Sequence, residues 1–135
     1  KSNIMKNKAE LIQEILGDFY DRAYYSEIVD EFINQFGIEA YQIENLQDDV
    51  QGYQQSLEAQ VSKYLDKTCS EEELAQMVQD ETSDLYSKML SEEYKKIISN
   101  ETKIFYEKLK AHLIQQGLLR NKSPWERIKD FFNLV

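Results

Sequence analysis

The chain has 135 residues, a formal net charge of −9 and a hydrophobic content of 41%. This length and composition predict one domain, residues 1–135, with a hydrophobic core. The acidic excess argues against binding to nucleic acids, where affinity comes from Lys and Arg at phosphates, and against binding to anionic membrane surfaces. One histidine and one cysteine leave little from which to build a conventional catalytic or metal site.

Four glycines and one proline leave few interruptions, so the sequence predicts an all-α fold. We expect an irregular antiparallel bundle of five to six helices. Apolar residues at helical spacing predict a first helix over residues 6–16, with a break at Gly17 and Asp18. A second helix is expected over residues 24–36, ended by Gly37 in a left-handed conformation.

The third segment carries the most regular apolar stripe of the chain. Its members repeat at steps of three and four residues: Ile43, Leu46, Val50, Tyr53, Leu57, Val61 and Tyr64. This spacing predicts one long helix. A long helix of a bundle is favoured over a coiled-coil seam, because charged pairs beside the stripe are not systematic. Gly52 costs about 1 kcal/mol of helix propensity, so a local bend is expected there.

Local capping chemistry predicts where the later helices begin. Ser70 and Glu73 have the spacing of a capping box, and Ser91 precedes two glutamates in the same way. Gly117 is expected to end the helix that Ser91 starts. The predicted apolar face of that helix consists of Tyr94, Ile97, Ile98, Ile104, Phe105, Leu109 and Leu113.

A short apolar helix is expected over residues 123–135, with Ser123 as its cap and Pro124 as its first residue. Trp125, Phe131 and Phe132 make this segment strongly apolar. We favour its packing onto the bundle, because it would otherwise expose a large apolar patch. Docking of the same residues on a partner protein is the alternative.

The remaining candidates for catalytic or metal-binding chemistry are three neighbouring carboxylates, the cysteine and the histidine. Asp80 and Asp84, with Glu81 between them, have the spacing of half a di-metal site, but the Glu-x-x-His motif of such sites is absent. Cys69 precedes a helix start that could activate a thiol, yet a partly buried, inert cysteine is favoured. His112 is expected at the surface or edge of its helix. No cofactor is predicted.

One stretch suggests a family. Residues 64–74, with the sequence YLDKTCSEEEL, are followed by Met77, Val78, Ser83, Lys88 and Met89. This pattern resembles a bacterial secreted or periplasmic family known only as domain of unknown function two-zero-five-nine. The chain departs from it at Thr82, Asp84 and Tyr86, where that family has an acidic residue, a proline and a glycine. The resemblance implies an all-helical, non-enzymatic protein in the periplasm or outside the cell, and it carries over no catalytic residues.

We therefore expect a non-enzymatic bacterial protein-interaction module. Its partner would be a protein with a basic surface, as in an immunity protein that blocks a basic toxin. The predicted contact residues are Asp48, Asp49 and Glu58, together with Trp125, Phe131 and Phe132. The alternatives are a small-molecule carrier lined by tyrosines and a carboxylate-based metal protein. Homo-oligomerisation is left open, and no apolar run is long enough to span a membrane.

Overall fold

A computed structural model describes residues 6–79 and 91–120 of the chain. Within these ranges the structure is all-helical and contains no strand. The elements are α1 (Lys8–Phe19), α2 (Arg22–Asn34), the short 3₁₀ helix η1 (Ala40–Gln42), α3 (Leu46–Thr68), α4 (Glu71–Gln79) and α5 (Glu92–Gln116). The predicted all-α bundle is confirmed. The helix predicted over residues 123–135 lies outside the described residues.

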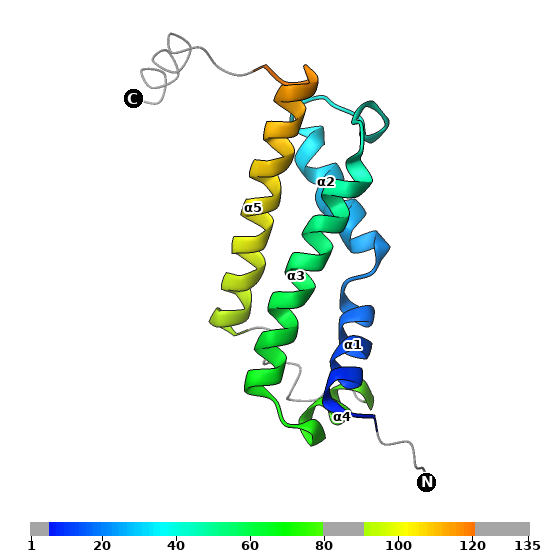
Figure 1. The fold of residues 1–135 in the computed structure, drawn as a ribbon, viewed down its shortest axis with the longest axis vertical. Helices are drawn as coiled ribbons and strands as arrows, with labels where there is room; N and C mark the ends of the chain where they lie inside the picture. The colour runs from blue at the N-terminus through cyan, green and yellow to red at the C-terminus, as the bar shows by residue number, and fades with distance from the viewer. Residues whose placement is uncertain (1–5, 80–90, 121–135) are drawn as a thin grey trace.

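The long helix α3 is the centre of the bundle (Figure 1). It packs against α5 along much of its length, and α1 and α2 follow one another along another side of it. Both α5 and the α1–α2 pair run antiparallel to α3, while α4 lies across the end of α1. Helix α3 therefore contacts α1, α2 and α5, whereas α4 packs on α1 and η1 packs on α2.

The core follows the predicted stripe from Tyr53 to Tyr64: Leu57 and Val61 are fully enclosed, and Tyr53 and Tyr64 are also buried. Leu65, outside the predicted stripe, is fully enclosed too, while Ile43 lies in the turn before α3, which begins at Leu46. The other completely buried large side chains come from four helices: Leu16, Ile33, Leu74, Leu109 and Leu113. Burial of apolar area at about 25 cal/mol per Å² is the main force that holds these helices together.

The predicted helix ends are correct where a local side chain or a glycine sets them. Ser70 and Glu73 form the predicted capping box, with N–O distances of 3.0 and 3.2 Å. Gly117 is the C-cap of α5, with a φ angle of 85°. Gly37 also has a positive φ angle, 70°, but α2 ends three residues earlier, at Asn34, and not at Phe36 as predicted. Helix α3 runs through Gly52 without interruption.

The break predicted at Gly17 and Asp18 is wrong, because α1 continues to Phe19. The helix ends instead before Asp21, whose side chain accepts the backbone N–H of Tyr24 at 2.9 Å and caps α2. Glycine is tolerated within a helix at a cost of about 1 kcal/mol. Burial of Leu16 on the preceding turn outweighs that cost.

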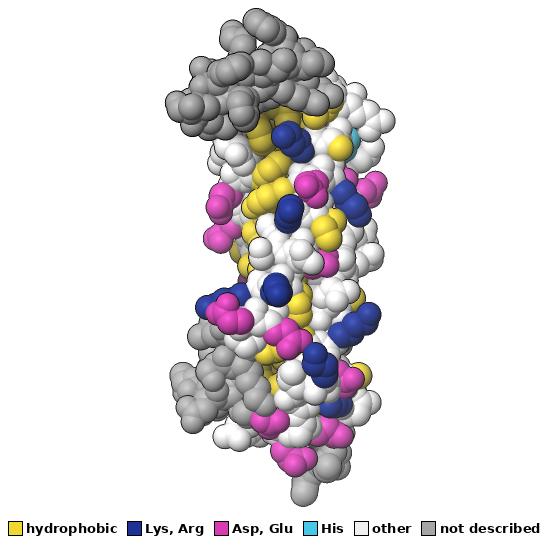
Figure 2. Space-filling model, turned by 90° about the vertical axis from the view of Figure 1, so that its left-hand side faces the viewer, with side chains coloured by type: hydrophobic (Ala, Val, Ile, Leu, Met, Phe, Trp, Pro, Cys, Tyr) yellow, Lys and Arg dark blue, Asp and Glu magenta, His cyan; other side chains and the backbone are white. Residues whose placement is uncertain are grey.

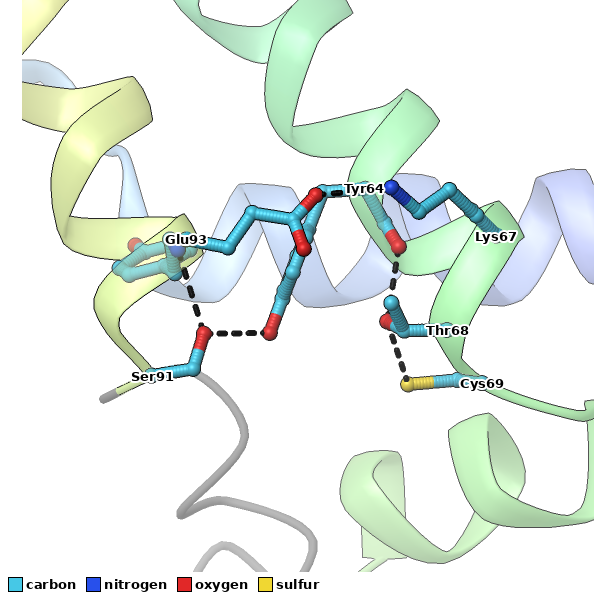
Figure 3. A network of polar contacts seen from close by, with 7 residues as sticks. Tyr64, Lys67, Thr68, Cys69, Ser91 and Glu93 are labelled. Atoms are coloured by element: carbon cyan, nitrogen blue, oxygen red, sulfur yellow. Dashed lines mark hydrogen bonds and ion pairs between the residues drawn. The ribbon is translucent and has the colours of Figure 1, made fainter.

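Ser91 joins the start of α5 to α3 (Figure 3). Its Oγ accepts the backbone N–H of Tyr94 at 3.2 Å and lies 2.6 Å from the hydroxyl of Tyr64, which is buried. An ion pair between Lys67 and Glu93 at 2.9 Å lies beside this contact. One hydroxyl thus caps a helix and holds two neighbouring helices in register.

The Ser91→Ala substitution should lower the free energy of unfolding by about 1–2 kcal/mol, because it removes a helix cap and a buried hydrogen bond together. Urea unfolding measures the loss. Ser91→Thr keeps an oxygen at this position and should recover most of the stability. Ser26→Ala, at an exposed position of α2, is the control and should stay close to wild type. Equal stability of the Ser91→Ala and Ser26→Ala proteins would contradict this role.

Candidate functional site

The predicted acidic contact residues lie on different sides of α3. The Oδ2 atom of Asp49 is 2.6 Å from Nδ1 of His112 on α5, and their side chains are 26% and 23% exposed. His112 is therefore held between two helices, at the edge of the interface. Asp48, the preceding residue, is exposed.

Glu58 faces α2 rather than α5. Its Oε2 accepts a hydrogen bond of 2.8 Å from the hydroxyl of Tyr25, which is buried. Nine residues separate Asp49 from Glu58, which corresponds to about half a turn around a helix axis at 3.6 residues per turn. The structure therefore does not gather Asp48, Asp49 and Glu58 into one acidic surface. Their contact with a partner stays a prediction.

The remaining sequence candidates fall into two groups. Trp125, Phe131 and Phe132, and the possible metal ligands Asp80, Glu81 and Asp84, lie outside the described residues. Cys69 is buried, as expected, with its sulfur 3.7 Å from Oγ1 of Thr68. Residues 6–79 and 91–120 contain no group of three or more His, Cys, Asp or Glu side chains that could hold a metal ion.

The clearest candidate for a binding surface is the partly buried margin of the apolar face of α5. Phe105, Leu109 and Leu113 are the buried residues of the helix, and they form its core face. Another row, defined by Tyr94, Ile98, Thr102 and Tyr106, repeats every four residues and runs along the partly buried margin of this core face. We call this row the α5 outer face. Its members also line a cavity of about 630 Å³, together with Lys95, Ser99, Lys103 and Glu107.

Figure 2 shows the surface on this side of the molecule. Hydrophobic side chains form a stripe along its length, and lysine or arginine side chains lie beside the stripe. Tyr94, Ile98 and Tyr106 are only partly buried against the core. The α5 outer face therefore presents apolar area that the described residues do not fully cover.

Helix α2 borders the α5 outer face. The ring of Tyr106 stacks on that of Phe32, with centroids 4.3 Å apart and planes inclined by 18°. The hydroxyl of Tyr94 contacts that of Tyr20, in the link between α1 and α2. The backbones of α2 and α5 make little contact, so these two helices meet mainly through side chains.

The electrostatic environment of this border is acidic on the α2 side. Burial raises the pKa of Tyr106, and the negative charge of Glu31 on α2 raises it further. Glu27 lies four residues before Glu31 and therefore one turn away on the same side of α2. On the α5 side, Lys95 and Lys103 line the cavity. The cavity lining on α5 thus carries two lysines and Glu107, while α2, which borders it, carries Glu27 and Glu31.

Edge-to-face and stacked rings connect the tyrosines of α2, α3 and α5. Ring centroids are 5.2 Å apart between Tyr24 and Tyr25, 5.6 Å between Tyr25 and Tyr53, and 4.5 Å between Tyr53 and Phe105. Aromatic pairs of this kind contribute about 0.5–1.5 kcal/mol each beyond the area they bury. These contacts indicate that the central tyrosines pack helices together.

The apolar face predicted for α5 included Ile104 and omitted Tyr106, so it did not show the α5 outer face. Ile104 was expected on the buried face, but its side chain is 42% exposed, so that assignment is wrong. Tyr94 and Ile98 do share the apolar arc of Phe105, but they are only partly buried. Tyr106, which the predicted face did not include, extends the margin of this arc at four-residue spacing.

Comparison with known proteins adds no relative. No family model matches the chain, and no curated protein or solved structure is significantly similar to it. None of the helices in the described part of the chain combines the length and apolar character needed to cross a membrane.

Proposed function

We propose that this chain is a non-enzymatic protein-binding module whose α5 outer face receives an amphipathic helix of a partner protein. The observation that carries the proposal is the row of Tyr94, Ile98, Thr102 and Tyr106, which is only partly buried and lines a cavity of about 630 Å³. Helix-in-groove recognition uses apolar anchors at this spacing. The bacterial, extracytoplasmic setting implied by the family resemblance is part of the same proposal.

The shape of the site favours a helix over a small molecule. Tyr94 and Tyr106 are twelve residues apart, which corresponds to about 18 Å along a helix axis. All the described residues that line the cavity belong to one side of α5. Small-molecule sites are concave and combine apolar walls with a few converging polar groups. An elongated face along one helix instead matches the side of another helix.

The charges beside the face define the partner further. Glu27 and Glu31 on α2 favour a partner helix with a basic edge on that side, because opposite charges steer association and fix orientation. This agrees with the expectation of a basic partner. The acidic residues proposed to contact it are then Glu27 and Glu31 on α2, and no longer Asp48, Asp49 and Glu58. Inhibition of a basic toxin, as by an immunity protein, is one activity that such a surface serves.

Site-specific photo-crosslinking of the full chain tests the proposal. A photoreactive residue at Ser99, which lines the cavity, should form a crosslink to a partner protein in lysate of the source organism. Position Asn100, exposed on the same helix about 100° away, is the matched control and should not crosslink to that protein. Mass spectrometry of the crosslinked peptide should identify a helical segment with a basic edge.

Two substitutions make the same experiment specific. Ile98→Asp places a charge within the face and should reduce the crosslink at least tenfold, because a buried unpaired charge costs several kcal/mol. Ile104→Asp places the same charge at an exposed position of α5 and should leave the crosslink intact. A crosslink that is equally strong in both variants would refute a binding site on the α5 outer face.

A further inference from the structure

We propose that the groove between α2, η1 and α3 is a second site, which binds an extended peptide of about three residues with free amino and carboxyl termini. We call it the α2–α3 groove. It holds a cavity of about 370 Å³, a volume within the range of small-molecule sites. The described residues that line it belong to α2, η1 and α3, and those that line the cavity at the α5 outer face belong to α5. The inference therefore goes beyond the proposed function.

The floor of the α2–α3 groove is apolar. Tyr25 and Val29 of α2 are buried, and Leu46 and Val50 of α3 are partly buried against the same core. Helices α2 and α3 pack against each other and run in opposite directions (Figure 1). The hydroxyl of Tyr25 already donates a hydrogen bond to Glu58, so Tyr25 contributes its ring to the floor. This floor offers contact to an apolar side chain of a ligand.

Polar side chains form the rim of the groove on both helices. On α2 they are Arg22, Ser26 and Asp30, which repeat every four residues along one side of the helix. On α3 they are Gln47 and Gln54, which are two turns apart. All five residues are exposed, and none of their side chains has a hydrogen-bond or ion-pair partner within residues 6–79 and 91–120. Their hydrogen-bonding capacity is therefore available to a ligand.

Opposite charges stand at the two ends of the rim on α2. Arg22 and Asp30 are eight residues apart, which corresponds to about 12 Å along the helix axis. Three extended peptide residues span about 10 Å, and the long side chain of Arg22 closes the difference. Arg22 binds the terminal carboxylate through its planar guanidinium, and Asp30 accepts hydrogen bonds from the terminal ammonium. The two charges thus fix the direction of the peptide in the groove.

The two glutamines on the rim favour a peptide over a zwitterion without amide groups. A glutamine side chain offers both donors and an acceptor, which match the C=O and N–H groups of a peptide backbone. Gln47 and Gln54 are about 10 Å apart along α3, again close to the length of three extended residues. Between them, Val50 and the ring of Tyr25 lie in the floor. We therefore expect an apolar central residue in the peptide.

Isothermal titration calorimetry of the full chain with the tripeptide Ala-Leu-Ala tests this site. The free peptide should bind with a dissociation constant of about 1 mM or tighter. Acetylation of its amino terminus and amidation of its carboxyl terminus should each weaken binding at least about fivefold, because each removes a charge-assisted hydrogen bond. Ser26→Trp places a large ring in the groove and should abolish binding.

Two charge-neutralising substitutions assign the peptide termini. Arg22→Gln should weaken binding of the free peptide at least about fivefold and remove the effect of amidation, while acetylation should still weaken binding. Asp30→Asn should give the reverse pattern. Lys63→Gln on α3 and Asp18→Asn on α1 are the matched controls, because both residues are exposed and neither lines the groove. Both controls should bind the peptide as wild type does.

The outcomes separate this inference from the proposed function. A wild-type protein that does not bind the free peptide at millimolar concentration would overturn the inference. Equal affinity for the free and the doubly blocked peptide would also overturn it, as would wild-type affinity in both Arg22→Gln and Asp30→Asn. The crosslink from Ser99 is measured on α5, so either test can fail while the other succeeds. Far-ultraviolet circular dichroism confirms that each variant keeps its helices.

Discussion

Replacing Leu57 with alanine should lower the free energy of unfolding by about 2–5 kcal/mol, the largest stability loss that we expect from one substitution in this chain. Leu57 has no exposed surface and lies midway along α3, the helix against which α1, α2 and α5 pack. Its truncation removes apolar contacts and leaves a cavity that the surrounding helices fill only in part. Urea unfolding followed by circular dichroism measures the change.

The matched control for this substitution is Ile104→Ala on α5. The side chain of Ile104 is 42% exposed, so its truncation should change the free energy of unfolding by no more than about 0.5 kcal/mol. Leu57→Met, which nearly conserves volume, should cost less than about 1.5 kcal/mol. A Leu57→Ala protein as stable as the Ile104→Ala protein would contradict the central position of α3.

The sequence predicted the features of the fold that depend on neighbouring residues. The capping box of Ser70 and Glu73 and the cap of Ser91 each need side chains only three residues from a backbone amide. The left-handed conformation of Gly117 likewise follows from the lack of a side chain at a helix end. Such local chemistry is visible in one stretch of sequence, so the starts of α4 and α5 and the end of α5 could be placed without a structure.

Contacts between helices could not be predicted in the same way. Asp49 and His112 are 63 residues apart, and their pairing depends on how α3 and α5 are rotated against each other. The same rotation decides that Phe105 is buried while Ile104 is exposed, although both are strongly apolar neighbours. Periodicity indicates that α5 has apolar residues on more than one side. Only the packed neighbour shows which side is the core.

Four tyrosines should make the fold unstable in alkali. Burial raises the pKa of Tyr94 from 10.0 to about 12. Burial also raises the pKa values of Tyr24, Tyr25 and Tyr106, with neighbouring tyrosine hydroxyls and the carboxylates of Glu58 and Glu31 as further causes. A phenol whose pKa is raised in the folded state loses its proton more readily when the chain unfolds, so high pH favours unfolding.

The sign and the pH range follow from proton linkage. Near neutral pH these tyrosines keep their protons in both states, so they add no pH dependence there. Above pH 10 the unfolded chain binds fewer protons than the folded chain, and stability falls as the pH rises through the folded pKa values. Each tyrosine that ionises only in the unfolded chain contributes a slope of at most about 1.4 kcal/mol per pH unit.

Urea unfolding at neutral pH and at several values between pH 10 and 12 measures this loss. Tyr94→Phe should lose less stability over that range than wild type, because one ionisable group is removed. Tyr41→Phe is the matched control, since the side chain of Tyr41 is 87% exposed, and it should follow the wild-type curve. If Tyr94→Phe and Tyr41→Phe lose stability equally, the alkaline loss does not arise from Tyr94. If only Tyr94→Phe loses less stability than wild type at high pH, folding shields the Tyr94 hydroxyl from water at its contact with Tyr20, in the link between α1 and α2.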